Sequence, residues 1–216
     1  MIAVVRLSGR HCDDVARLHL GHLRSPLRGI PGQRLLRAYY ATIAKGTGAC
    51  GYVAEDDGAV VGYVCGIWEA SKVYSTLLRR YWPELVAWYI AQLAIHPALI
   101  ASCIGRIRGL LGRPDDSDAI GYELRPIVVA PAARGTGIAF ELAATLLADA
   151  GRRGFQNIHL FTEVDNMAAN AFYRKVGFLP TGSVCRANIS YIRYELEIGQ
   201  IINPSFAQTP DERLAQ

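Results

Sequence analysis

The most informative part of the chain reads Glu123-Leu-Arg-Pro-Ile-Val-Val-Ala-Pro-Ala-Ala-Arg-Gly-Thr-Gly-Ile-Ala139. The β-branched run 127–129 suits a strand, and Pro131 ends it. Gly135 and Gly137 then precede an apolar run of good helix formers. A helix N-terminus presents unpaired N–H groups and a partial positive charge, and glycines let an anion approach the backbone. We therefore expect a strand, a turn and a helix whose first residues bind an anion, most simply a diphosphate.

The composition fits one domain with a packed core. The chain has 216 residues, 51% of them hydrophobic, which argues against disorder over most of its length. The formal net charge is +4, without any dense block of Lys and Arg. Such a charge is too small and too scattered to indicate nucleic-acid binding, but it favours an anionic ligand.

The cysteines favour a reducing compartment. The five of them are widely spaced, without a Cys-x-x-Cys pair, which argues against a disulfide framework and a zinc site. His19 and His22 lie three residues apart but have no evident third ligand nearby, so we expect no metal. The first residues lack the apolar core of a signal peptide. The default expectation is a cytoplasmic protein.

The rest of the chain alternates strand and helix patterns. Strands are expected at 2–7, 51–56, 59–68, 157–164, 179–184 and 190–198, helices at 12–20, 33–44, 138–153 and 167–176, and a loop at 24–32. Asp57-Gly58 between two apolar runs predicts a tight hairpin turn. The strand–helix–strand step that begins at residue 123 predicts a parallel pair with a right-handed crossover.

Residues 69–118 differ from their surroundings and are expected to form a helical insertion. No charged residue occurs from Leu85 to Gly105, but Gln92, His96 and Pro97 interrupt the run. We therefore expect two shorter helices and no membrane span, because a proline would break or kink the helix at its centre. Attachment to a membrane surface through 74–108 stays open. Residues 1–198 are expected to form one domain, followed by a loose tail at 199–216.

Three phosphate-binding patterns can be compared with the glycine-rich turn. A P-loop needs Gly-Lys followed by Ser or Thr, which the chain lacks. A dinucleotide fingerprint needs a third small residue, but Phe140 occupies that position. The pattern Arg/Gln-x-x-Gly-x-Gly/Ala is matched by Arg134, Gly137 and Ala139.

With this third pattern the chain resembles the GCN5-related N-acetyltransferases, the GNAT superfamily. A second signature supports the resemblance, because Asn166-Met-Ala-Ala-Asn-Ala-Phe-Tyr-Arg-Lys-Val-Gly-Phe178 is similar to the family's Asn-x-x-Ala, Tyr and Gly-Phe. The resemblance is loose over 50–68 and good over 121–195. It implies an α/β fold with a mixed, mostly antiparallel sheet of about six to seven strands, a splayed parallel pair and flanking helices. It also implies acetyl-CoA as the donor.

The family pattern implies positions for the cofactor. Acetyl-CoA would lie where the two parallel strands splay apart, and Pro126 suits such an opening because it cannot donate a ladder hydrogen bond. Val129 N–H would stabilise negative charge on the acetyl oxygen. Arg134 would contact the diphosphate or merely brace the loop. The residues implied in cofactor binding are Ile127, Val128, Val129, Arg134, Gly135, Thr136, Gly137, Ile138, Ala139, Asn166 and Tyr173.

Two residues are implied in catalysis. Glu123 matches the position of the glutamate base in the histone-acetylating branch of the family; its alternative role is an ion pair with a nearby arginine. Tyr173 falls on the family's tyrosine and would donate a proton to the departing thiolate; its alternative role is core packing. Asn166 would cap a helix and could also touch the pantetheine.

The acceptor is expected to be the primary amine of a small molecule, attacking directly in a ternary complex. It would meet residues 24–40, the insertion, and the loop before the last strand, where the aromatic residues Tyr39, Tyr40, Tyr81, Trp82, Trp88 and Tyr89 either line a pocket or simply pack. A protein or peptide acceptor and a non-catalytic acyl-CoA-binding module are the alternatives. A homodimer stays open.

Overall fold

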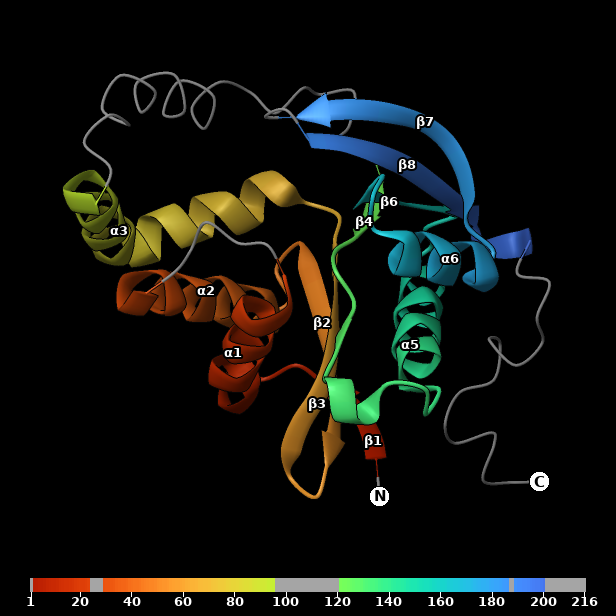
Figure 1. The fold of residues 1–216 in the computed structure, drawn as a ribbon, viewed down its shortest axis with the longest axis horizontal. Coiled ribbons are helices and arrows are strands. Elements are labelled where there is room, and N and C mark those ends of the chain that lie inside the picture. Colours follow the sequence, from red (N-terminus) through yellow and green to blue (C-terminus); the bar gives the residue numbers. More distant parts are fainter. Residues whose placement is uncertain (1, 24–28, 96–120, 187–188, 201–216) are drawn as a thin grey trace. The chain divides into compact units, whose positions relative to one another are not determined.

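The computed structural model describes residues 2–23, 29–95, 121–186 and 189–200 (Figure 1). The chain forms two compact units. The sheet unit comprises Met1–Arg6, Gly51–Ile67 and Gly121–Gln216, and the helical unit comprises Leu7–Cys50 and Trp68–Ile120. The glycine-rich turn lies in the sheet unit, and the expected insertion lies in the helical unit.

The sheet unit contains one eight-stranded sheet within its described residues. The strands are β1 (Ile2–Arg6), β2 (Ala49–Asp56), β3 (Ala59–Ile67), β4 (Tyr122–Leu124), β5 (Val128–Val129), β6 (Asn157–Glu163), β7 (Leu179–Arg186) and β8 (Ile189–Glu197). Their order is β1-β2-β3-β4-β6-β8-β7, with β5 paired to β3. The same unit holds the helices α5 (Ile138–Arg152) and α6 (Met167–Val176) and short 3-10 turns at Pro131–Ala133 and Ile198–Gln200.

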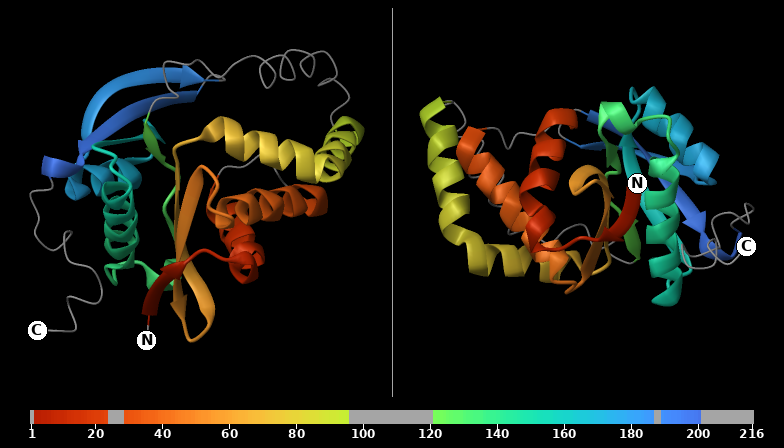
Figure 2. Two further views of the ribbon diagram at one scale, coloured as in Figure 1. Left: turned by 180° about the vertical axis from the view of Figure 1, so that it is seen from behind. Right: turned by 90° about the horizontal axis from the view of Figure 1, so that it is seen from below.

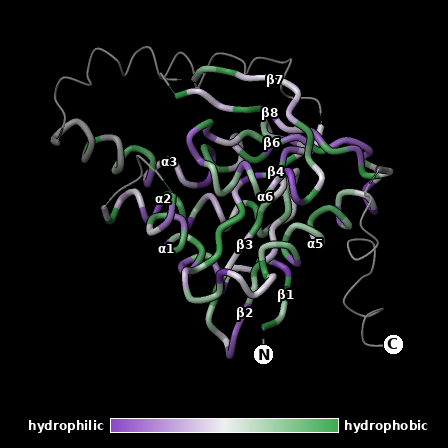
Figure 3. Tube along the Cα trace, turned by 45° about the vertical axis from the view of Figure 1, so that its right-hand side comes forward, coloured by the Kyte–Doolittle hydropathy of each residue, from purple (hydrophilic) through white to green (hydrophobic). Residues whose placement is uncertain are grey.

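The hairpin of β2 and β3 forms where the sequence predicts it. Asp57 and Gly58 both have positive φ angles, 47° and 83°. Two consecutive positive φ angles define the type I′ turn, whose twist matches that of the strands it joins. The turn is hydrophilic, whereas β3 is largely hydrophobic (Figure 3), and the last six residues of β3 are buried. The two-residue turn fixes the pairing of β2 with β3, and this pairing determines which residues of β3 reach the core.

The sheet is antiparallel except at one pair of strands. β4 and β6 run parallel, with Tyr122 opposite Ile158 and Glu123 opposite His159. The helix α5 connects β5 to β6, and the described pairs β1–β2, β3–β4, β3–β5, β6–β8 and β7–β8 are antiparallel. A mixed, mostly antiparallel sheet with one parallel pair is therefore confirmed. The strand predicted over 123–129 is divided into β4 and β5, which raises the number of strands to eight.

A β-bulge separates β4 from β5. Leu124 lies opposite Gly66, and Val128 lies opposite Tyr63, so the three residues 125–127 face only two residues of β3. One extra residue in one strand is the definition of a bulge, which bends the strand and disrupts the ladder locally. Pro126 lies within it and has no N–H to lose. Beyond Glu123 no described residue of β4 or β5 pairs with β6, so the ladder opens at this point.

The two faces of the sheet differ in character. One face is apolar and is packed by α5 and α6, which lie on the same side of the sheet (Figures 1 and 2). Its side chains are at most 5% exposed; they are Tyr122, Leu124, Ile158, Leu160, Tyr194 and Leu196. Gly66 belongs to this face, because a Cβ built there would lie 2.2 Å from the Tyr122 hydroxyl. The other face carries charged side chains on β4, β6 and β8, described below, whereas its β3 side chains, Tyr63, Cys65 and Ile67, are buried.

The helical unit is built from α1 (Cys12–His22), α2 (Gly29–Ala44) and α3 (Ala70–Ile95), with a 3-10 turn at Gly9–His11. Leu35, Ala38 and Leu77 form a buried cluster, against which Tyr39, Tyr81 and Leu85 pack. The predicted loop over 24–32 is wrong from residue 29 onward, because α2 begins at Gly29. A proline is tolerated in the first turn of a helix, where its missing N–H has no intrahelical partner, so Pro31 does not prevent this start.

α3 is the described part of the expected insertion. It continues from Ala70 to Ile95 but is kinked at Tyr81, whose φ of −123° and ψ of 27° are not helical. Pro83 explains the kink, because its ring clashes with the preceding turn. The kink divides α3 into two segments at residue 81. The break that the sequence predicts at Pro97 lies outside the described residues, so the two shorter helices expected around it stay a prediction. In the part of the chain that the structure describes, no helix is long and apolar enough to cross a membrane.

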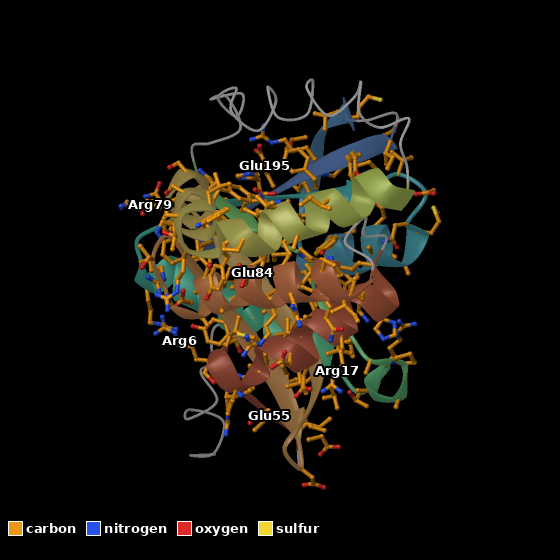
Figure 4. The ribbon with its side chains drawn as sticks, turned by 90° about the vertical axis from the view of Figure 1, so that its left-hand side faces the viewer. Arg6, Arg17, Glu55, Arg79, Glu84 and Glu195 are labelled. Carbon is orange, nitrogen blue, oxygen red and sulfur yellow. The ribbon has the colours of Figure 1, made fainter. Side chains whose placement is uncertain are left out.

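The aromatic residues of the helical unit mostly pack. Tyr40 is 1% exposed, and its hydroxyl lies 2.7 Å from His19 Nδ1. Burial lowers the pKa of His19 below its ordinary value, so this imidazole stays neutral as a hydrogen-bond partner of Tyr40 at neutral pH. Trp82 is 61% exposed on α3, the helix that also carries the charged residues Arg79 and Glu84 labelled in Figure 4. Tyr39, Tyr40 and Tyr81 therefore pack within the helical unit, which was one of the two interpretations of these aromatic residues; the other was that they line a pocket.

Candidate active site

A cavity of about 470 Å³ lies at the N-terminus of α5. Its lining residues come from β5, the glycine-rich turn and the facing side of α6; they are Val129, Ala133, Arg134, Gly135, Gly137, Ile138, Ala139, Phe140, Phe172 and Lys175. Its size is typical of cavities that bind a small molecule. Five residues implied in cofactor binding from 134–139 line it, while Thr136 faces the turn and donates a hydrogen bond to Ala133 O.

The glycines of the turn shape the head of α5. Gly135 and Gly137 have φ angles of 81° and 89°, which side chains rarely adopt. A Cβ built at either glycine meets nothing within 4 Å, so the space above the backbone is open. Gly137 is the N-cap, and the N–H groups that follow it begin the helix. Open space, unpaired N–H groups and the positive end of the helix dipole together make an anion cradle.

Arg134 connects this turn to β5. Its Nε donates a hydrogen bond of 3.3 Å to Val129 O. Arg134 therefore braces the turn and, with Lys175 across the cavity, adds positive charge to it. Lys175 Nζ lies 5.2 Å from the centre of the Phe140 ring, which itself packs on Phe172 at 5.0 Å. The sequence analysis missed Phe140, Phe172 and Lys175 as cavity residues; the i, i+3 spacing of the last two on α6 is the signal that could have placed them on one face.

The edge of β5 offers main-chain groups to the opening. Ala130 N–H donates to Val61 O at 2.7 Å, and Val128 lies opposite Tyr63. Because hydrogen-bonded and non-bonded pairs alternate in an antiparallel ladder, the N–H and C=O of Val129 point away from β3. The N–H of Ile127 points the same way and donates to the Tyr173 hydroxyl. The bulge thus turns alternate main-chain groups toward the place where β4 and β6 part.

Tyr173 lies at the inner end of this opening. It is 7% exposed, and its ring packs against Phe172, Phe178 and Tyr194. Burial raises the pKa of Tyr173 to about 12, and the hydrogen bond from Ile127 opposes that rise. Since the hydroxyl oxygen accepts from Ile127, its own proton remains to be donated to another group. Tyr173 therefore packs in the core and also takes part in a hydrogen bond.

The helix that carries Tyr173 is fixed at both ends. Asn166 is the N-cap of α6, and its side chain accepts a hydrogen bond of 3.2 Å from Ala169 N–H. Asn170 donates to the main-chain oxygens of Glu163, Val164 and Asn166 and accepts from Tyr194. Gly177 ends α6 with a φ of 113°. Asn166 thus has the capping role, and Asn170, which the sequence analysis did not single out, ties α6 to the end of β6.

Glu123 lies on the other face of the sheet. Its side chain is 19% exposed and forms an ion pair with Arg125, with 2.9 Å between Oε2 and Nη2. Its neighbours Tyr122 and Leu124 point to the apolar face, which α6 and Tyr173 pack, because successive residues of a strand alternate between faces. Glu123 and Tyr173 therefore approach the opening from opposite sides.

The chain matches the sequence model described as Acetyltransferase (GNAT) family over residues 20–178. That match covers well over half of the chain. The chain belongs to the GNAT family. The search of curated proteins returned no significant match.

Solved structures of this family share its fold. A GNAT-family protein from Desulfovibrio desulfuricans superposes with a TM-score of 0.59 at 16% identity, covering 92% of this chain and 99% of that one. The yncA protein of Salmonella typhimurium, solved with its cofactor acetyl-CoA, has a TM-score of 0.59 at 16% identity and coverages of 94% and 97%. The ribosomal-protein-S18-alanine N-acetyltransferase of Escherichia coli has a TM-score of 0.54 at 13% identity and coverages of 92% and 94%. At such low identity the similarity establishes the fold alone.

The family membership confirms four predictions from the sequence: the GNAT resemblance, the fold class, the N-acetyltransferase activity and acetyl-CoA as donor. The GNAT protein described here has, on its own residues, a cradle that fits this donor. The open backbone at Gly135 and Gly137 fits a diphosphate, and Lys175 and Arg134 supply positive charge beside it.

Proposed function

We propose that this GNAT protein transfers an acetyl group from acetyl-CoA to the primary amine of a small molecule, by direct attack in a ternary complex. The observation that carries the proposal is the opening between β5 and β6, which has an anion cradle at one end and Tyr173 and Glu123 at the other. When bound, acetyl-CoA supplies the activated acetyl thioester. We further propose that residues 1–198 act as one domain, with 69–118 as an insertion and 199–216 as a tail.

The donor is proposed to bind along the path that the described groups define. The backbone of Gly135, Thr136, Gly137, Ile138 and Ala139 would hold the diphosphate, with Arg134 bracing the turn. Ile127, Val128 and Val129 would lie along the pantetheine arm, with Val129 N–H directed at the position of the acetyl oxygen. Asn166 would act mainly by capping α6. Phe140, Phe172 and Lys175 extend the cavity on the far side of the diphosphate.

Tyr173 is proposed to stabilise the departing sulfur mainly by a hydrogen bond. A phenol with a pKa of about 12 is a much weaker acid than a thiol, whose ordinary pKa is near 8.5. Complete proton transfer to the thiolate would therefore be uphill by about 5 kcal/mol. A hydrogen bond from the phenol to the sulfur avoids that penalty and still favours bond cleavage as negative charge develops.

Glu123 is proposed to accept the proton of the attacking amine, directly or through water. Its position opposite Tyr173 suits this role, because the nucleophile and the leaving group then meet different faces of the sheet. The ion pair with Arg125 holds the carboxylate in place. Two alternatives remain. One is a peptide or protein amine as acceptor, the class of acceptor in the name of the Escherichia coli structure, and the other is a module that binds acyl-CoA without turnover. Surface attachment through 74–108 and homodimerisation stay predictions.

Turnover of acetyl-CoA by the purified protein tests the proposal. Release of the thiol would be measured with glucosamine, phenylethylamine, lysine and an alanine-led hexapeptide as acceptors, next to direct measurement of acetyl-CoA binding. Glu123→Gln and Tyr173→Phe should each lower kcat by at least about tenfold while leaving acetyl-CoA affinity unchanged. Binding without turnover of any amine would support the non-catalytic module, and turnover confined to the hexapeptide would support the peptide acceptor. Unchanged donor binding in Gly137→Glu would refute the cradle.

A further inference from the structure

Three titratable side chains form a row across the charged face of the sheet. Glu123 on β4 lies opposite His159 on β6, and His159 lies opposite Glu195 on β8. Residues directly opposite in neighbouring strands share a face, and neighbouring strands are about 4.8 Å apart. The row therefore spans about 10 Å, with an imidazole between two carboxylates. It begins at the residue where β4 and β6 part.

Exposure changes along this row. The Glu123 side chain is 19% exposed, His159 is 6% exposed, and the Glu195 side chain is 42% exposed. Leu179, which lies opposite Glu195 on β7, is 65% exposed. Glu195 lies on β8 (Figure 4). The row thus leads from a largely enclosed carboxylate, through a buried imidazole, to a carboxylate in contact with water.

The imidazole in the middle lies between two neighbours. A Cβ built on Gly121 would lie 3.5 Å from His159 Nδ1, so Gly121 lies beside the ring. The Phe161 ring meets the imidazole nearly at a right angle, with 5.9 Å between centres. Gly121, just before β4, and Phe161 on β6 thus flank the imidazole.

The flanking charges hold the two carboxylates. Arg125 pairs with Glu123 at 2.9 Å, and Arg193 pairs with Glu195 at 2.8 Å. Arg125 follows Glu123 by two residues, in the bulge just after β4, and Arg193 precedes Glu195 by two residues on the same face of β8. The charged or titratable groups next to His159 on the described neighbouring segments are therefore Glu123 on β4, Arg125 just after it, and Arg193, Glu195 and Glu197 on β8.

The proposed reaction must release one proton in every cycle. An ammonium acceptor and an acetyl thioester give an amide, a thiol and one proton: the N–C bond forms, the C–S bond breaks, and the thiol keeps one of the two protons that the nitrogen loses. A base that has accepted the other proton has to return to its carboxylate form before the next cycle. Glu123 is largely enclosed, so it needs a route by which that proton reaches water.

We propose that His159 carries this proton from Glu123 to Glu195, from which it passes to water. Imidazole is the side chain that accepts and releases protons most readily near neutral pH, and it can accept on one nitrogen while it donates from the other. His159 is thus a positioning and relay residue that acts through Glu123. This inference rests on the proposed function, because it concerns the proton that amine acetylation releases.

Steady-state kinetics of three variants test the relay, using the amine of the four-member panel that the wild type acetylates fastest. His159→Gln should lower kcat about 100-fold at pH 7, with KM for acetyl-CoA within twofold of the wild type. Added imidazole should restore part of the rate, because a small buffer base can replace a missing relay but cannot repair a distorted sheet. Glu195→Gln should lower kcat several-fold, again with rescue by buffer.

Glu197→Gln is the matched control. Glu197 lies on the same face of β8, two residues from Glu195, but opposite Asn157 instead of His159. Its kcat should equal that of the wild type. A kcat within twofold of wild type in both His159→Gln and Glu195→Gln, or a loss that imidazole does not restore, would overturn the relay while leaving the proposed function intact. Acetyl-CoA binding without turnover of any amine by the wild type would instead overturn the proposed function and the relay with it.

Discussion

Tyr173→Phe separates the stability effect of a buried phenol from its part in the chemistry. Burial raises the pKa of Tyr173 from 10 to about 12 in the folded protein. Below pH 10 the phenol is neutral in both the folded and the unfolded state, so its contribution to stability is fully present. As pH rises from 10 to 12 only the unfolded state ionises, and that ionisation favours unfolding. Stability is therefore lost with rising pH in the wild type through this group, but not in the phenylalanine variant.

The size of the effect follows from the two pKa values. A change of one in pKa corresponds to 1.36 kcal/mol, so the wild type loses about 1.4 kcal/mol by pH 11 and about 2.7 kcal/mol well above pH 12 through Tyr173 alone. The variant loses the hydrogen bond from Ile127 N–H instead, which costs about 1 kcal/mol at every pH. The wild type should be the more stable protein at pH 8, and the two stabilities should become equal close to pH 11.

Urea denaturation of both proteins at pH 8, 9, 10 and 11 measures this difference. Because the other ionisable groups are common to both proteins, their effects cancel in the comparison. In parallel, kcat of Tyr173→Phe at pH 8 should fall by tenfold or more with little change in KM for acetyl-CoA, because we propose that the phenol donates a hydrogen bond to the departing sulfur. Two free energies of unfolding that stay parallel from pH 8 to pH 11 would show that Tyr173 is not buried as described.

Three substitutions test other parts of the sheet unit. Gly66→Ala should destabilise the protein by more than about 2 kcal/mol, because its Cβ would overlap the hydroxyl and ring of the buried Tyr122; Gly182→Ala, with nothing within 4 Å, is the control in the same denaturation experiment. Gly137→Ala and Gly154→Ala impose similar backbone strain of about 1 kcal/mol at φ angles of 89° and 85°, yet only Gly137→Ala should weaken acetyl-CoA binding in calorimetry. Equal affinities in these two variants would contradict the cradle at the head of α5. Lys175→Gln should weaken acetyl-CoA binding about two- to fivefold at low salt and less at high salt; an affinity independent of salt and of this substitution would count against its contact with a phosphate.

Much of the sheet unit follows from local sequence. Asp57-Gly58 encodes the hairpin turn because few residues other than glycine, asparagine and aspartate adopt two successive positive φ angles. The limits of α6 were predicted correctly because Asn166 and Gly177 provide a side-chain cap and a left-handed end. Such features depend on a few neighbouring residues, so they can be recognised without knowledge of the fold.

Other features could not be predicted because they depend on pairing between distant segments. The bulge at 125–127 is defined by the register between this segment and β3. The sequence of one strand therefore does not reveal that it has an extra residue. The row of Glu123, His159 and Glu195 likewise arises from the registers of two strand pairs. The early start of α2 was missed for a different reason, since Gly29 and Pro31 favour a loop in isolation and packing of the helix outweighs that preference.

The bulge gives the sheet a property that neither neighbouring strand has by itself. Without the extra residue β4 and β5 would form one strand, whose main-chain groups could pair with β6 along their whole length and close the sheet. With it, the pairing of β4 and β6 ends at Glu123, and alternate groups of Ile127 and Val129 face the opening. In the proposed mechanism, acetyl-CoA binds on the face of the sheet that α5 and α6 cover. The opening in the sheet then gives an amine on the opposite face access to the thioester. Removing one residue from 125–127 should therefore abolish acetyl transfer even where the cradle at the head of α5 still binds acetyl-CoA, and transfer at the wild-type rate in that deletion variant would refute this role of the bulge.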